Sequence, residues 1–375
     1  MKKLKVMTIL GTRPEIIRLS EVIKACERHF EHVLTHTGQN YDYTLNQVFF
    51  DEMGIPSPAH YLNVAGAHLG ESLGNIISRS YSLLKEQMPD ALLVLGDTNS
   101  ALSAISAKRL KIPIFHMEAG NRCFDENLPE EVNRRIVDHT SDINLCYSEH
   151  ARRNLLAEGK RPEYSFVTGS PMTEVLFVNM DAIDKSRVLD DLNLESGKFI
   201  LLSAHREENI DIEKNFFSLM NAVNLLAENY DMPVIYSMHP RSAEFIEKRE
   251  FKFHTNVRCM EPFGFFPYCK LQKHAFCVVS DSGTLPEETN YMDFPAVSIR
   301  TSTERPEAMD KGRFVLGGIN GESVLQAVDL AVKPKNKASV SDYEDINVSS
   351  KVVGIIQSYT EIVNQRIWRK YEQFR

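Results

Sequence analysis

Short apolar runs alternate along the chain with longer stretches in which apolar positions recur every three or four residues. The short runs are rich in β-branched residues and predict buried strands, whereas the longer stretches predict amphipathic helices. The predicted strands are residues 5–10, 32–36, 91–95, 113–116, 143–146, 199–203, 234–238, 275–279 and 296–299. This regular alternation predicts parallel sheets with helices on both faces.

The strand–helix pattern restarts near residue 199, and a chain of 375 residues is long enough for two domains. We expect one domain over residues 1–168 and a second over residues 169–351, because Gly169 and Pro171 interrupt the pattern between them. Residues 352–371 have apolar positions at spacings of three and four, which predicts a long C-terminal helix.

Polar residues stand where many of the predicted strands end. Open parallel sheets bind ligands outside the carboxyl ends of their strands, so these residues are candidates for a binding site. They are Arg13, Gln39, Asp97, His116, Glu118, His205, His239, Ser282 and Gly283.

Residues 275–289 combine a predicted strand, a turn of small residues and a helix that starts near Pro286. Free backbone N–H groups and the helix dipole would make this turn an anion site, and Gly283 would let a phosphate approach closely. Glu288, one turn into the helix, could accept hydrogen bonds from ribose hydroxyls. An ordinary capped strand–helix turn explains the segment equally well.

Four carboxylates form an acidic set: Asp97, Glu118, Glu130 and Glu131. The first two end strands, and together such groups could perform acid–base chemistry at a carbon–hydrogen bond. For Glu130 and Glu131, which open a helix, the simpler explanation is that they complement the helix dipole. Structural roles are likewise the simpler explanation for a lone histidine such as His116 and for Arg305, which precedes a proline-started helix.

Composition and missing motifs argue against several classes of function. A net charge of −8 argues against a general nucleic-acid binder, and no apolar stretch is long enough to span a membrane. Six scattered cysteines with no CxxC pair fit the cytoplasm and argue against structural zinc. Without HExxH, GxGxxG or Walker A motifs, we expect no metal and no cofactor.

Seven short motifs occur in a fixed order along the chain. They are Gly11-Thr-Arg-Pro-Glu15, Gly96-Asp-Thr98, His116-Met-Glu-Ala-Gly120, Pro129-Glu-Glu-Val-Asn-Arg134, His205-Arg206, Asp281-Ser-Gly283 with Glu287-Glu288, and Thr303-Glu-Arg-Pro-Glu307. Through them the chain resembles the non-hydrolysing UDP-N-acetylglucosamine 2-epimerases over nearly its whole length. The resemblance implies an α/β fold of two Rossmann-like domains facing a cleft (glycosyltransferase-B type), a homodimer, and a C-terminal helix (residues 352–375) that packs back on the first domain.

The same resemblance implies roles for individual residues. Asp97, Glu118, Glu130 and His205 match catalytic positions. Arg18, which stands where the family usually has a lysine, would bind the substrate. The UDP-sugar would also be bound by Arg13, Ser282, Gly283, Glu288 and Arg305.

Departures from the usual motifs suggest a branch within the family. His205-Arg-Glu-Glu208 and Ser282-Gly-Thr284 resemble the enzymes that convert UDP-2-acetamido-2,6-dideoxy-L-talose into UDP-N-acetyl-L-fucosamine for capsule or O-antigen synthesis. Glu207 also replaces an arginine in a region through which some relatives bind an activating second UDP-sugar. The chain could instead be a UDP-N-acetylglucosamine 2-epimerase, a glycosyltransferase, a hydrolysing relative or a non-catalytic UDP-sugar sensor.

Overall fold

The computed structural model describes residues 3–38, 43–333 and 338–370, and only the backbone of residues 43–47 and 208. The chain divides into two compact units. Unit 1 comprises Met1–Val175 and Ser341–Arg375, and unit 2 comprises Leu176–Val340. Gln39 lies outside the described residues.

Unit 1 is built on a seven-stranded parallel sheet with the order β3-β2-β1-β4-β5-β6-β7. Its strands are β1 (Lys5–Leu10), β2 (Glu31–His36), β3 (His60–Tyr61), β4 (Ala91–Leu95), β5 (Ile114–Met117), β6 (Ile143–Cys146) and β7 (Ser165–Val167). Its helices are α1 (Arg13–His29), α2 (Tyr43–Met53), α3 (Leu69–Gln87), α4 (Ser103–Arg109), α5 (Pro129–Thr140), α6 (Glu149–Ala157) and α16 (Val348–Arg366), with short turns η1 (Asn99–Leu102), η2 (Pro162–Tyr164) and η3 (Ser341–Tyr343).

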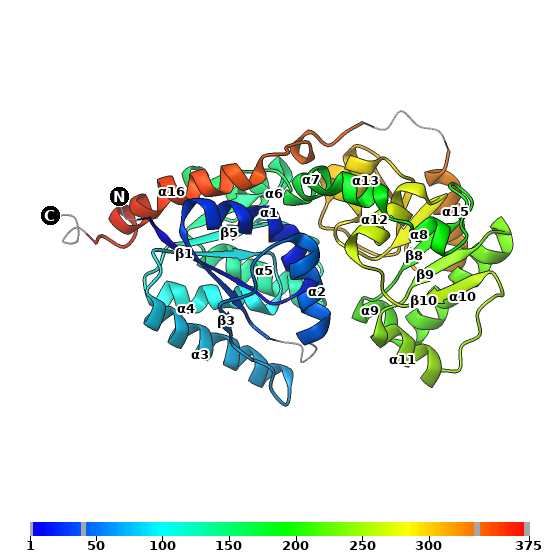
Figure 1. Cartoon of the computed structure of the whole chain (residues 1–375), viewed down its shortest axis with the longest axis horizontal. Helices are drawn as coiled ribbons and strands as arrows, with labels where there is room; N and C mark the ends of the chain where they lie inside the picture. The colour runs from blue at the N-terminus through cyan, green and yellow to red at the C-terminus, as the bar shows by residue number, and fades with distance from the viewer. Residues whose placement is uncertain (1–2, 39–42, 334–337, 371–375) are drawn as a thin grey trace. The chain divides into compact units, whose positions relative to one another are not determined.

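The sheet of unit 1 is covered by helices on both faces (Figure 1). On one face Leu84 of α3, Ala104 of α4 and Val137 of α5 form a single core with the strand residues Met7 and Leu92. On the other face α1 packs against α16, which returns to this unit from the C-terminal end of the chain (Figure 1).

Unit 2 repeats the arrangement with a six-stranded parallel sheet in the order β10-β9-β8-β11-β12-β13. Its strands are β8 (Ile200–Ser203), β9 (Val234–Ser237), β10 (Val257–Met260), β11 (Cys277–Ser280), β12 (Ala296–Ser298) and β13 (Val315–Leu316). Its helices are α8 (Val188–Asp191), α9 (Glu207–Ile210), α10 (Glu213–Tyr230), α11 (Pro240–Lys248), α12 (Phe265–His274), α13 (Leu285–Met292), α14 (Pro306–Asp310) and α15 (Gly321–Ala331), and α7 (Pro171–Lys185) spans the boundary between the units.

The core of unit 2 lies between its sheet and two helices. Phe216 and Val223 of α10 pack with Val328 of α15 against strand residues such as Ile200 and Val297. These side chains are fully or almost fully buried, so the apolar spacing of three and four along residues 210–230 forms a core-facing stripe.

Two helices differ from the sequence-based expectation. The apolar pattern of residues 210–230 predicts one helix, whereas the structure has α9 and then α10. Arg249 donates to the carbonyl oxygens of Ile210 (2.7 Å) and Asp211 (2.8 Å) and so ends the first helix. Helix α16 begins at Val348 rather than residue 352, where the Glu174 carboxylate accepts from the N–H (2.7 Å) and hydroxyl (2.6 Å) of Ser349. Both causes are contacts between residues distant in sequence.

In the described ranges, no helix combines the length and the apolar character needed to cross a bilayer.

Candidate active site

In both units the candidate residues gather at the middle of the sheet. The strand order reverses direction between β1 and β4 in unit 1 and between β8 and β11 in unit 2. The loops that leave such neighbouring strands in opposite directions open a crevice at the sheet's carboxyl edge. Asp97 follows β4, and Ser282 follows β11, so each unit has candidates at its own switch point.

Asp97 is held by an arginine from a neighbouring helix. Arg134 of α5 donates to Asp97 Oδ2 from Nε (3.0 Å) and Nη2 (2.5 Å). The Asp97 side chain remains 18% exposed, whereas that of Arg134 is 5% exposed. The carboxylate is therefore fixed from its protein side while part of it faces outward.

Glu118 follows β5 with its backbone in the left-handed region (φ 64°). Its side chain is 7% exposed and forms an ion pair with Arg18 of α1, while Asn121 Nδ2 lies 3.4 Å from Glu118 Oε1. A Cβ placed on Gly96 would stand 3.0 Å from Glu118 Oε2, which puts this carboxylate beside the residue that precedes Asp97. The structure thus brings Asp97, Glu118 and Arg18 together.

Glu130 and Glu131 occupy different environments in the first turn of α5. Glu130 is half-buried, whereas Glu131 is fully buried and accepts from the backbone N–H groups of Cys123 (3.2 Å) and Phe124 (3.3 Å) and from Arg134 Nη1 (2.9 Å). Burial opposes ionisation of Glu131, but these donors outweigh it and hold its pKa below the usual value. Glu131 therefore anchors the preceding loop, and Glu130 remains the candidate for chemistry.

Glu15 is a buried carboxyl group that our sequence reasoning did not assign. It accepts from the Gly11 N–H (3.0 Å), the Thr12 hydroxyl (2.8 Å) and the Ser100 hydroxyl (2.6 Å), so it joins the turns after β1 and β4. Burial raises its pKa, although the three donors partly offset that effect. Arg13, two residues earlier, is exposed and lies over the Phe49 ring, with 5.3 Å from its guanidinium carbon to the ring centre.

In unit 2 a buried aspartate orients His205. Asp281 Oδ1 lies 3.1 Å from His205 Nδ1, and Asp281 Oδ2 accepts from the N–H groups of His205 and Arg206, both at 2.9 Å. Burial alone would favour protonation of Asp281, but His205 and the N–H donors hold its pKa far below the ordinary range. The His205 side chain is 42% exposed, so an oriented imidazole is presented beside the turn at Ser282.

The turn after β11 is held by hydrogen bonds of its own: the Ser282 N–H donates to Ser280 Oγ (3.1 Å) and the Thr284 N–H to Ser282 Oγ (3.4 Å). Ser282 Oγ lies 3.0 Å from Thr284 Oγ1, which donates to Glu288 Oε1 at 2.7 Å. A Cβ on Gly283 would lie 3.1 Å from Glu304 Oε1 and 3.8 Å from Arg206 Nη2, so a side chain here would crowd the turn.

Glu288 and Arg305 are both buried within unit 2. Glu288 also accepts from Gln272 Nε2 at 2.5 Å, and burial raises the pKa of its carboxyl group. Arg305 is 1% exposed and donates from Nε to Glu287 Oε1 at 2.8 Å. Glu288 lies in α13, directly after the turn, and Arg305 contacts the same helix through Glu287. Their proposed contacts with the substrate remain predictions.

Glu207 takes part in a surface ion-pair cluster. Arg241 contacts Glu207 Oε1 from Nη1 (2.6 Å) and Asp211 Oδ2 from Nη2 (2.5 Å). The residue that departs from the usual family motif therefore engages an arginine within the same unit.

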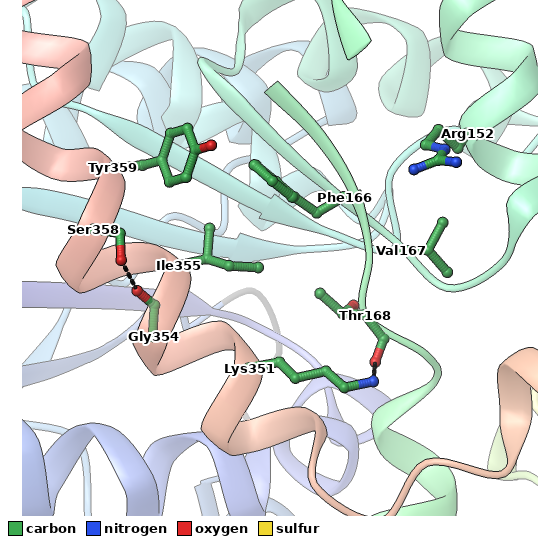
Figure 2. A pocket seen from close by; sticks show the side chains of 9 residues that line it. All are labelled: Arg152, Phe166, Val167, Thr168, Lys351, Gly354, Ile355, Ser358 and Tyr359. Carbon is green, nitrogen blue, oxygen red and sulfur yellow. Dashed lines mark hydrogen bonds between the residues drawn. The ribbon is translucent and has the colours of Figure 1, made fainter. Parts of the chain in front are cut away.

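The structure also contains a cavity of about 520 Å³ in unit 1, between α16, β7 and α6. Figure 2 shows Lys351 reaching the Thr168 carbonyl (3.0 Å) and Tyr359 near Phe166, whose rings meet edge to face with centres 4.9 Å apart. None of the candidate site residues lines it, so the cavity is separate from the polar strand ends. Across residues 3–38, 43–333 and 338–370, no group of three or more His, Cys, Asp or Glu residues is arranged to hold a metal ion.

Comparison with known proteins identifies the family. The model of the family "UDP-N-acetylglucosamine 2-epimerase" matches residues 24–357. The UDP-N-acetylglucosamine 2-epimerase of Rickettsia bellii has a solved structure that is 46% identical, covers 98% of this chain and 99% of its own, and has a TM-score of 0.91. That of Methanocaldococcus jannaschii, solved with UDP-GlcNAc and UDP, is 32% identical over 95% of this chain and 100% of its own, with a TM-score of 0.89.

The matching proteins are named for more than one UDP-sugar substrate. The UDP-2,3-diacetamido-2,3-dideoxy-D-glucuronate 2-epimerase of Pseudomonas aeruginosa is 33% identical over 86% of this chain and 91% of its own. The expected fold of two parallel-sheet α/β domains of the glycosyltransferase-B type is confirmed. With that fold and a family match over most of its length, the chain belongs to the UDP-N-acetylglucosamine 2-epimerase family and is a non-hydrolysing UDP-sugar 2-epimerase.

Proposed function

We propose that the enzyme inverts C2 of a UDP-2-acetamido sugar by releasing UDP and adding it back. The C2 hydrogen of such a sugar lies next to no carbonyl group, so simple deprotonation is unfavourable. In the elimination, a base removes the C2 proton, the C1–O bond breaks, and its electron pair leaves with UDP to give a 2-acetamidoglycal. UDP oxygen then attacks C1 while C2 receives a proton from the opposite face.

The proton transfers are assigned to Asp97 and Glu118, with Glu130 as the third acidic group. The observation that carries this proposal is the pairing of two strand-end carboxylates, each fixed by an arginine: Asp97 by Arg134 and Glu118 by Arg18. Proton transfer to and from carbon requires groups held at defined positions, and a fixed carboxylate costs little reorganisation when the reaction occurs.

Binding of UDP is assigned mainly to unit 2. Ser282 and Gly283 would bind the diphosphate and Glu288 the ribose. Arg13, Arg18 and Arg305 would supply further contacts with the substrate. His205 would act beside the departing phosphate, because its Nδ1 atom faces Asp281 and its Nε2 atom is thereby assigned to the ligand. A firm hold on UDP is required because the same molecule must return to C1.

For the substrate we propose UDP-2-acetamido-2,6-dideoxy-L-talose, with UDP-N-acetyl-L-fucosamine as the product for capsule or O-antigen synthesis. The support is the branch-like sequence at residues 205–208 and 282–284. The second candidate is UDP-N-acetylglucosamine, converted to UDP-N-acetylmannosamine, and the names of the Rickettsia bellii and Methanocaldococcus jannaschii relatives favour it. We further propose a cytoplasmic homodimer, which light scattering of the purified protein would test.

The decisive experiment incubates the enzyme with each UDP-sugar alone in D2O and follows the products by NMR. We expect an epimer carrying deuterium at C2, and full retention of the original C2 hydrogen would overturn the elimination route. Turnover of UDP-N-acetylglucosamine without turnover of the L-talose derivative would overturn the substrate assignment. Release of free sugar and UDP would indicate a hydrolase, transfer only to an added acceptor would indicate a glycosyltransferase, and binding without turnover would indicate a sensor.

A further inference from the structure

A buried histidine lies directly beneath the acidic set of unit 1. His116 belongs to β5 and is 0% exposed. Its Nε2 atom is 2.8 Å from the carbonyl oxygen of Gly96, and its Nδ1 atom is 2.9 Å from Oδ1 of Asp138 on α5. Gly96 immediately precedes Asp97, so the ring contacts the turn that carries one of the two proposed acid–base groups.

Asp138 contacts the other turn. Both of its carboxylate oxygens lie 3.2 Å from the N–H of Gly120, two residues after Glu118. Its Oδ2 atom also accepts from Arg122 Nη1 at 2.7 Å. Burial would disfavour the ionised form, but His116 and Arg122 together hold the pKa of Asp138 below its usual value.

The contact with Gly96 fixes which ring nitrogen of His116 donates. A carbonyl oxygen can only accept, so Nε2 carries a proton and donates it to the Gly96 oxygen. Nδ1 lies on the other side of the ring, against the Asp138 carboxylate. The imidazole therefore stands between the turn of Asp97 and Asp138 of α5.

Asp138 is itself held by a chain of ion pairs. Arg122, which donates to Asp138, also donates to both carboxylate oxygens of Glu158, at 2.8 and 2.6 Å. His139 Nε2 lies 3.1 Å from Glu158 Oε2. Asp138 therefore has a fixed position from which it contacts both the His116 ring and the Gly120 N–H.

We propose that His116 and Asp138 form a buried pair that holds the turns of Asp97 and Glu118 in register for catalysis. The pair rests on the proposed function, in which those two carboxylates exchange the proton at C2. Its contacts are to the backbone at Gly96 and Gly120, so both members are positioning residues. Without the pair, the two turns can shift independently while the diphosphate-binding residues of unit 2 are unchanged.

The kinetic test uses His116→Gln and Asp138→Asn. We expect kcat to fall by about tenfold to a hundredfold, because small displacements of reacting groups have effects of that size. KM and the Kd for UDP should stay within about threefold, since the altered geometry acts on the chemical step. His32→Gln is the matched control, because the His32 side chain is also 0% exposed but contacts Thr8 and Glu27 on the other side of β1.

A second measurement uses the wild-type protein and does not depend on whether the variants fold. Nitrogen-15 NMR, with the His116 ring assigned through its bonds to the backbone, should show a proton on Nε2 that is hydrogen-bonded to the Gly96 carbonyl. A bare Nε2 would overturn the proposal, as would a folded His116→Gln enzyme whose kcat lies within about threefold of wild type. Failure of the proposed function is distinguishable, because the wild-type enzyme itself would then form no epimer.

Discussion

Arg134 donates two hydrogen bonds to a single oxygen of Asp97 and a third to Glu131. The guanidinium is thereby fixed between two carboxylates, one partly exposed and one fully buried. This arrangement orients Asp97 through a planar group with several donors, which a lysine ammonium cannot reproduce.

We therefore expect Arg134→Lys to retain the positive charge but lose the orientation of Asp97. Epimerisation kcat should fall by about tenfold or more, with UDP affinity little changed, because the fork geometry of arginine is not conserved in lysine. Arg135→Lys is the matched control, since Arg135 is the next residue of α5 and its partners are Glu126 and Glu131. Equal kcat values for the two variants would contradict the role given to Arg134.

Asp97→Asn and Glu118→Gln keep the shape of each side chain and remove its charge. Each change should lower kcat by about a hundredfold or more, as expected for loss of a general acid or base. The Kd for UDP, measured by calorimetry, should change little because the proposed diphosphate site lies in unit 2. Glu126→Gln, at a carboxylate that is 73% exposed, is the control. Near-normal turnover in both variants would show that other groups transfer the proton.

Gly283→Ala tests the proposed diphosphate site at its closest point. The added methyl group would lie 3.1 Å from Glu304 Oε1 and on the surface that a phosphate would approach. We expect UDP to bind about tenfold more weakly, because a backbone approach that admits glycine excludes a side chain. Gly74→Ala in α3, where nothing lies within 4 Å of the new carbon, should leave binding unchanged. Unaltered affinity in Gly283→Ala would place the diphosphate elsewhere.

Glu15 gives a prediction for stability as a function of pH. Burial raises the pKa of its carboxyl group above the ordinary 4.5, so folding favours the protonated form. This contribution is complete below pH 4.5 and is lost as the pH rises through the folded-state pKa. Glu15→Gln cannot ionise and does not suffer that loss, so its stability relative to wild type should improve steadily as the pH increases.

Urea unfolding of both proteins between pH 5 and pH 8 measures the effect. At pH 5 the variant should be less stable by about 1 kcal/mol, the usual cost of altering a buried hydrogen bond. The deficit should shrink or reverse by pH 8. A difference that stays constant across this range would mean that Glu15 has the same proton occupancy in the folded and unfolded chains.

The sequence predicted most of the fold because its strands are continuous apolar runs flanked by polar turns. Strands such as Lys5–Leu10 and Ala91–Leu95 have the expected bounds. Short or amphipathic strands were missed, including β10 (Val257–Met260), which has two exposed residues, and the two-residue strands β3 and β13. Their pairing depends on neighbours in the sheet and leaves little local signal.

In the candidate site, too, some residues could be identified from the local sequence and others only from contacts between distant residues. Asp97 and Glu118 could be proposed because each lies within two residues of a strand end. Arg134, Glu15 and Asp281 act through partners distant in the sequence: Arg134 and Asp97 are 37 residues apart, and Glu15 and Ser100 are 85 apart. A carboxylate in the Asp281-Ser-Gly283 motif was visible, but its contact with His205 required the β8–β11 pairing.

The return of α16 to unit 1 has a consequence for synthesis on the ribosome. Val352, Ile356 and Val363 of α16 are fully buried, and this helix packs against α1, yet the whole of unit 2 is translated between them. At roughly 5–20 residues per second, that interval lasts on the order of ten seconds or more. Throughout it, the face of α1 that α16 later covers is exposed on the nascent chain. The unit whose synthesis begins first is therefore completed last. A chaperone can bind this face of α1 during that interval.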